Sequence, residues 1–264
     1  MHIETRTLLA AVGPLALDAA DRQTVTRALI ALDREFHALG LKLLVAENLA
    51  EFGQFLGSVG KFLPNAFHPH LKPCRPGDGL AFFAADESGT VATSGVRLYR
   101  FATTTLADHL ATLSLFYANP AEQMERGERL FIDGEAETFA STIDDTAFWE
   151  GGMWIRPDWR RHGSSLPRLM GYAANAVALA RWGRQTAFSI VEVRQDHRKA
   201  IEAARRLYDV EVAASTIRWR RPRKPSRQEM LLVASGPDHI LGQMSRLVSN
   251  VSLELPTLPA AASG

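Results

Sequence analysis

Residues 152–165, read GMWIRPDWRRHGSS, combine the side chains and the backbone pattern that bind a phosphate group. An apolar, β-prone run leads into a basic turn that contains glycine and serine, and a helix is expected directly after it. The backbone N–H groups of residues 161–165 and the positive end of the helix dipole would then point toward one place. Gly163 would allow close approach of a pyrophosphate, and Arg160 or Arg161 would add positive charge. The alternative is an ordinary strand-to-helix turn with solvated arginines.

The segments around this turn alternate between strand and helix. Apolar runs rich in β-branched and aromatic residues indicate the strands, and a 3.6-residue apolar repeat indicates the helices. A strand–helix–strand–helix order predicts two parallel strands joined by a right-handed crossover. The expected elements are a strand at 148–155, a helix at 166–182, a strand at 186–193, a helix at 197–208 and a hairpin formed by 211–220 and 229–233.

The preceding part of the chain predicts more helices and a further hairpin. The expected elements are helices at 19–39 and 46–56, a loop at 61–79, strands at 80–85 and 91–101, a helix at 105–117 and helical pieces near 122–129 and 135–142. The fold class is therefore α/β, with helices on a mixed sheet. We expect a single domain over 1–235, with its core best supported at 80–101 and 148–235, a helical insertion at 102–147, and a C-terminal helix with a flexible tail at 236–264.

Composition narrows the class of protein. The chain has 264 residues, 46% of them hydrophobic, so it can bury a sizeable core. A formal net charge of +1 argues against a general nucleic-acid or membrane binder. Cys74 is the one cysteine, which excludes an intrachain disulfide and fits a reducing cytoplasm. No apolar run reaches the roughly 20 residues that cross a bilayer, and Gly13 and Pro14 interrupt the apolar run at 8–17, which makes it a weak secretion signal.

Two segments resemble the acetyl-CoA-binding elements of the GNAT superfamily of N-acyltransferases. The family motif, Arg/Gln-x-x-Gly-x-Gly/Ala, aligns on Arg160, Gly163 and Ser165. A recurring Ala-x-x-Leu-Tyr element of the family's next helix aligns on residues 204–208. The resemblance implies a GNAT-like mixed, mostly antiparallel sheet flanked by helices, with helical elaborations. It also implies acetyl-CoA, or another acyl-CoA, as co-substrate and no metal.

The resemblance assigns the acetyl-CoA site to two parts of the segment. The strand would leave its parallel neighbour and bind pantetheine through its backbone, and the turn would bind the pyrophosphate. The residues implied are Met153, Trp154, Ile155, Arg160, Arg161, His162, Gly163, Ser164 and Ser165. The chain departs from the family pattern at Ser165, where glycine or alanine is usual, and at Pro167, which removes one donor from the first helical turn.

Acyl transfer to an amine needs a base for the ammonium and an acid for the departing thiolate. By the family resemblance Tyr208 is the acid, and the alternative is a tyrosine that caps the core. Glu150, at the start of the first strand, and Glu192, near the end of the next, are candidate bases, acting directly or through water. A carboxylate at a solvated strand end is the alternative for each.

Charge is unevenly distributed along the second half of the chain. Residues 131–155 contain six acids and no lysine or arginine, whereas basic residues dominate from Arg156 onward. An acidic side would attract an amine and a basic side would attract CoA, although two solvated faces of opposite sign would give the same pattern. The expected partner is a small-molecule or peptide amine, with no membrane, and a homodimer stays open.

Two other functions remain as alternatives. The protein could bind acyl-CoA without catalysis. The basic residues at 218–227 could instead bind nucleic acid or an acidic partner, although Trp219 is the one aromatic residue among them. A metal site built on His68, His70 and Cys74 is not expected, because no further ligand follows at the spacing of a known zinc site.

Overall fold

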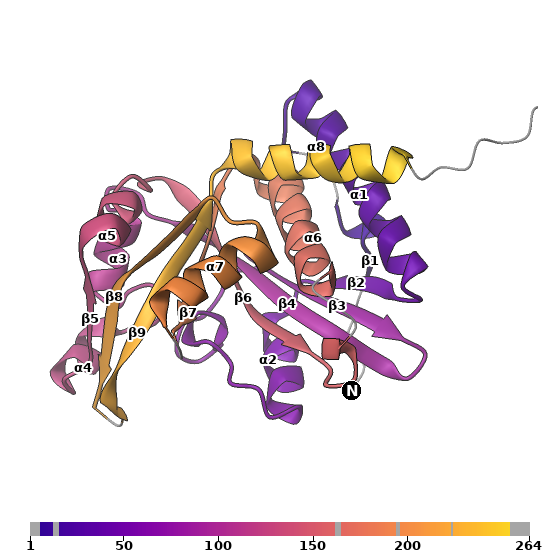
Figure 1. Cartoon of the computed structure of the whole chain (residues 1–264). Helices are drawn as coiled ribbons and strands as arrows, with labels where there is room; N and C mark the ends of the chain where they lie inside the picture. The colour runs from indigo at the N-terminus through magenta and orange to yellow at the C-terminus, as the bar shows by residue number, and fades with distance from the viewer. Residues whose placement is uncertain (1–5, 13–15, 162–164, 194–195, 223, 254–264) are drawn as a thin grey trace, which may run out of the picture.

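The computed structural model describes residues 6–12, 16–161, 165–193, 196–222 and 224–253 (Figure 1). Over these residues a nine-stranded sheet has the order β1-β2-β3-β4-β6-β7-β9-β8-β5. The strands are β1 (Arg6–Thr7), β2 (Lys42–Ala46), β3 (Gly79–Asp86), β4 (Gly89–Arg100), β5 (Arg129–Ile132), β6 (Thr146–Ile155), β7 (Thr186–Glu192), β8 (Val212–Arg221) and β9 (Lys224–Ser235). The β6–β7 pair is parallel and the other pairs are antiparallel. The expected fold class, a mixed and mostly antiparallel sheet flanked by helices, is confirmed.

Helices cover both faces of the sheet (Figure 1). They are α1 (Ala19–Ala38), α2 (Leu49–Ser58), α3 (Leu106–Ala111), α4 (Pro120–Glu125), α5 (Gly134–Ala140), α6 (Ser165–Trp182), α7 (His197–Tyr208) and α8 (Pro237–Leu253). On one face α1, α6 and α8 form a core with Phe148 of β6, and α7 packs beside them on Leu231 and Val233 of β9. On the other face α2, α3 and α5 form a second core with Trp149 and Phe188.

The strands β6 and β7 separate soon after they meet. Their parallel pairing runs from Ala147 with Thr186 to Trp149 with Phe188. Beyond this point β6 continues on β4 as far as Ile155, and β7 continues on β9 as far as Glu192. The sequence predicted that the strand separates from its parallel neighbour around Met153–Ile155, and these residues do lie beyond the last β6–β7 pair, at Trp149.

A bulge in β6 lies where the two strands part. The register with β4 shifts between Thr93 and Gly95, which leaves the extra residue on β6 at Gly152 or Met153. Gly152 has a φ of +67°, a conformation that glycine adopts without strain. A Cβ atom there would lie 2.5 Å from Phe52 Cζ of α2. Glycine is therefore required both by the backbone and by the packing of α2 against the bulge.

Several elements differ from the sequence predictions. The strand β2 was not predicted, because it has only five residues, begins two residues after Gly40 and is separated from α2 by only Glu47 and Asn48. The helical insertion at 102–147 contains the edge strand β5, in which Leu130 is buried and Phe131 is exposed. The helix expected at 105–117 ends at Ala111, since the backbone turns at Leu113 with a φ of +61°. The helix after Gly236 is longer than expected, at 17 residues, and packs against α1 and α6.

Candidate active site

A cavity of about 410 Å³ lies where β6 and β7 part. It is lined by β4, β6, β7, β9, α6, α7 and the loop at 61–64, and it contains all three predicted acid–base residues, Glu150, Glu192 and Tyr208. Met153 also lines it. The structure therefore brings together side chains that are up to 58 positions apart in the sequence.

Of Glu150 and Tyr208, Glu150 has the more strongly shifted pKa. It follows Trp149 on β6 and therefore points to the opposite face, toward α6, where a Cβ atom on Gly171 would lie 3.4 Å from its Oε1. Burial disfavours the charged carboxylate and raises the pKa of Glu150 to about 7. A carboxyl group with this pKa exchanges its proton readily at neutral pH.

Tyr208 ends α7 on the same side of the sheet. Burial raises the pKa of Tyr208, and the negative charge of Glu150 raises it further. The two side chains are thus close enough to interact electrostatically. The phenol stays protonated at neutral pH and has a proton to donate.

Glu192 lies on the other side of the same opening. It shares the strand face of Phe188 and Ile190, which point to the core with α2 and α3. Gln228 Nε2 of β9 donates a hydrogen bond to its Oε1 at 2.9 Å. The cavity therefore passes through the sheet, with Glu150 and Tyr208 on one side and Glu192 on the other.

Three buried polar side chains of the cavity were not predicted from the sequence. Ser94 of β4, Trp149 of β6 and Asn175 of α6 are 0%, 4% and 7% exposed. Their Oγ, Nε1 and Oδ1 atoms have no hydrogen-bond partner among the described residues. A buried polar atom without a partner is costly in a folded protein, so a ligand with amide or carbonyl groups would be stabilised here. Asn175, an amide on the buried side of an apolar helix, was the sequence signal that could have revealed this.

The end of α7 is held by a cluster that the sequence did not reveal. Asp209, the residue after Tyr208, adopts a left-handed conformation with a φ of +51°. Its carbonyl oxygen accepts hydrogen bonds from Gln243 and His239 of α8. Its carboxylate accepts one from the Tyr172 hydroxyl of α6 at 3.0 Å. Helices α6 and α8 therefore hold the C-terminal end of α7, where Tyr208 lies, in a fixed position.

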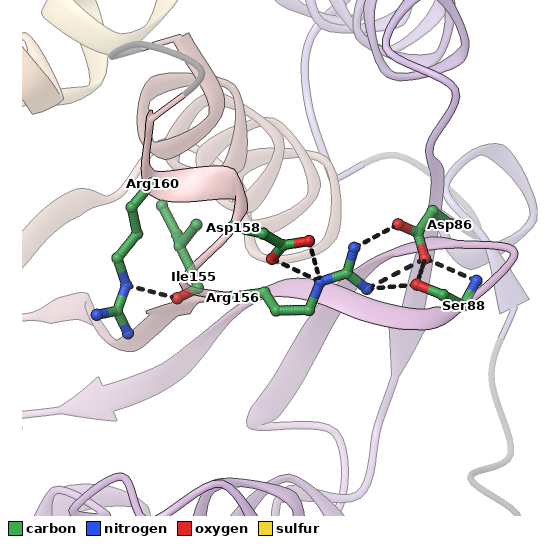
Figure 2. A network of polar contacts seen from close by, with 6 residues as sticks. All are labelled: Asp86, Ser88, Ile155, Arg156, Asp158 and Arg160. Atoms are coloured by element: carbon green, nitrogen blue, oxygen red, sulfur yellow. Dashed lines mark hydrogen bonds and ion pairs between the residues drawn. The ribbon is translucent and has the colours of Figure 1, made fainter.

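The basic turn after β6 is only partly described. Figure 2 shows that Arg156 is bound by Asp86, Ser88 and Asp158, and these contacts join β6 to the β3–β4 turn. Arg160 Nε donates to the carbonyl oxygen of Ile155 at 2.9 Å (Figure 2).

Ser165 is the first residue of α6, as the phosphate-binding interpretation requires. His162, Gly163 and Ser164 lie outside the described residues, so the pyrophosphate site stays a prediction at these positions. Trp154 points away from the cavity, toward α2, where its ring centroid is 5.5 Å from that of Phe55. Any contact of Trp154 with pantetheine would therefore use its backbone.

The other features considered in the sequence analysis lie outside this cavity. A cavity of about 470 Å³ near the start of α2 includes Cys74 and Lys72 but none of the predicted acid–base residues. In the described residues, no group of three or more potential ligands could hold a metal ion. No described helix is both long and apolar enough to cross a membrane. In the basic hairpin, Arg218 pairs with Asp133 and Arg221 stacks on Trp219.

Comparison with known proteins gives a fold-level likeness only. No protein-family model matches the chain, and no curated protein sequence matches it. Among solved structures, it is similar to a polyamine N-acetyltransferase of Drosophila melanogaster that forms N-acetylagmatine, with 12% identity over 74% of this chain and 99% of that chain and a TM-score of 0.40. It is also similar to a serine-to-alanine mutant of an agmatine N-acetyltransferase without ligand, with 14% identity, the same two coverages and a TM-score of 0.37.

The raised pKa of Glu150 predicts how the free energy of unfolding changes with pH. The unfolded chain loses this proton near pH 4.5 and the folded chain near 7, so stability falls as pH rises between these values. The cost above about pH 7 is on the order of 3 kcal/mol. We expect Glu150→Gln to raise the melting temperature at about pH 8 and to change it little at about pH 4.

The matched control is Glu87→Gln, a change at an exposed turn residue. It should leave the pH dependence of melting as in the wild type. If Glu150→Gln melted in parallel with the wild type across this range, the assignment of a buried, strongly shifted carboxyl group would be wrong.

Proposed function

We propose that the protein is a GNAT-type N-acyltransferase that moves an acetyl, or another short acyl, group from acyl-CoA to a primary amine. The observation that carries the proposal is the meeting of Glu150 and Tyr208 in a cavity formed where β6 leaves its parallel neighbour. A thioester lying in this opening would have a base and an acid within reach. The resemblance of 160–165 and 204–208 to the family's CoA-binding elements supports the same function.

The unpartnered polar atoms of the cavity fit the pantetheine arm. This arm carries amide N–H and carbonyl groups, which complement the Asn175 Oδ1 and the Ser94 hydroxyl. Met153, beside them, offers an apolar contact for the methylene groups. The turn at 160–165 would hold the pyrophosphate at the start of α6.

The proposed reaction needs one direct attack. Glu150, directly or through a water molecule, takes a proton from the bound ammonium, and the free amine attacks the thioester carbonyl. The C–N bond forms, the C–S bond breaks, and Tyr208 gives its proton to the departing thiolate. The nitrogen loses its second proton as the amide forms, and this proton restores Tyr208. The proton on Glu150 then leaves to solvent, so each turnover yields an amide, a thiol and one released proton.

Between the two candidate bases, the surroundings favour Glu150. Its pKa of about 7 matches neutral pH, and it lies on the side of the sheet that holds Tyr208. Glu192, on the other side, would then attract the ammonium rather than deprotonate it. The single cysteine fits an enzyme of the reducing cytoplasm, where thiols stay reduced.

A non-catalytic acyl-CoA-binding protein is the second candidate function. The sequence motifs concern CoA binding more than chemistry, and the same cavity could hold a thioester without transferring it. Acylation of amines distinguishes the two functions.

Removing the candidate base should remove the acidic limb of the pH–rate profile. We expect kcat/KM for an amine to rise with pH up to about 7, as Glu150 loses its proton. Glu150→Gln should lower kcat/KM by roughly 10²-fold or more and abolish this limb. Glu192→Gln is the matched comparison and should keep the limb. If the acidic limb were lost in Glu192→Gln and kept in Glu150→Gln, Glu192 would be the base and Glu150 would not.

Removing the candidate acid should affect turnover and not binding. We expect Tyr208→Phe to lower kcat by roughly 10²-fold, because no proton reaches the thiolate, while the affinity for acetyl-CoA measured by calorimetry changes little. The phenyl ring keeps the packing of α7, so the melting temperature should be close to that of the wild type. Unchanged turnover would exclude Tyr208 as the acid.

A further inference from the structure

A second cavity, of about 280 Å³, opens from the first on the side of the sheet that faces α2 and α3. The two cavities share five lining residues, which are Phe62, Pro64, Trp149, Ile190 and Glu192. They therefore form one recess that continues past the reacting centre. Acyl-CoA would enter from the side of the sheet on which the start of α6 and Tyr208 lie, so the second cavity is left for the acceptor.

The walls of this second cavity are aromatic. The ring centroids of Phe116 and Trp219 are 4.3 Å apart, and Phe116 meets Trp149 edge to face at 5.5 Å. All three rings line the cavity and are nearly fully buried. These rings pack against one another and form one continuous aromatic wall, which favours a flat, apolar ligand lying against it.

A guanidinium group forms the far end of the same cavity. Arg221 stacks on the Trp219 ring, with its Cζ 3.8 Å from the ring centroid, and its side chain is 18% exposed. Its Nε is buried and 3.6 Å from Glu128 Oε1, which is longer than a hydrogen bond. Among the described residues, no hydrogen bond from this guanidinium is present. Arg221 is therefore fixed in direction while its donors stay available.

The contacts of the Glu128 carboxylate explain why the Arg221 guanidinium can still donate hydrogen bonds to a ligand. Glu128 is 6% exposed and its Oε1 accepts hydrogen bonds from the Tyr117 hydroxyl at 2.9 Å and from Trp219 Nε1 at 2.7 Å. These neutral donors occupy the oxygen nearest to Arg221. A guanidinium with free donors beside apolar walls is a receptor for a carboxylate, which it can bind with two parallel hydrogen bonds.

We infer that the acceptor is a primary amine that carries a carboxylate at the far end of an aromatic body. Its ammonium would lie at the junction of the cavities, beside Glu192 and Glu150, and its carboxylate would meet Arg221. Strands β7 and β9 lie between the opening and β8, and neighbouring strands are ~4.8 Å apart, so an α-amino acid is too short to reach both ends. This inference rests on the proposed acyl transfer for the amine, but the carboxylate subsite can be tested without it.

The first test measures binding by calorimetry and needs no transfer. Para-toluate has the aromatic body and the carboxylate but no amine, and para-toluamide is its neutral counterpart. We expect para-toluate to bind the wild type at least about tenfold more tightly than para-toluamide. Arg221→Gln should remove this difference, and Arg220→Gln, a change at the exposed neighbour, should keep it. Equal binding of the two ligands to the wild type would overturn the subsite, whatever the variants do.

The second test measures transfer. We expect the ratio of kcat/KM for para-(aminomethyl)benzoate over benzylamine to fall at least about tenfold in Arg221→Gln. An unchanged ratio would overturn the role of Arg221 in choosing the acceptor. If para-toluate bound through Arg221 but neither amine were acylated, the carboxylate subsite would stand and the proposed acyl transfer would be wrong.

Discussion

The parting of β6 from β7 is the constraint on which the proposed site depends. Two parallel strands that pair over three positions and then follow different neighbours leave backbone edges that face one another without a ladder between them. The bulge at Gly152 or Met153 lies beyond the last β6–β7 pair, and Phe52 of α2 packs so closely against Gly152 that only glycine fits there. The resulting opening passes through the sheet. Ligands that approach from opposite faces can therefore meet inside the protein.

The same opening explains the chemistry of the groups around it. Glu150 points toward α6, and no positive side chain among the described residues offsets its burial, which moves its pKa to about 7. Tyr208 is kept protonated by the same burial and by Glu150 itself. Its position depends on Asp209, which α8 holds through Gln243. The C-terminal helix thus connects the core with α1 to the reacting centre.

The sequence predicted the parts of this site that depend on local pattern. The run from β6 to α7 has clear periodicity, and β6, α6, β7 and α7 begin and end within two residues of their predicted bounds. The three residues that the sequence named as candidate acid and bases line the opening, and their roles stay predictions.

Contacts between distant segments were not predictable. The strand β2 exists because it pairs with β3, and β5 because it pairs with β8, and neither pairing leaves a periodic signal in so short a run. The recess around Arg221 is of the same kind, since it combines β8 with residues from five other segments.

The central claim, that the opening holds the thioester arm of acyl-CoA, is tested most directly by calorimetric titration of the wild type and Ser189→Phe, whose new ring would fill the cavity on β7. Acetyl-CoA should bind the wild type and bind the variant at least about tenfold more weakly, while the nucleotide half of CoA without pantetheine should bind both alike. Equal affinity of acetyl-CoA for both proteins, or no binding to the wild type, would contradict the account.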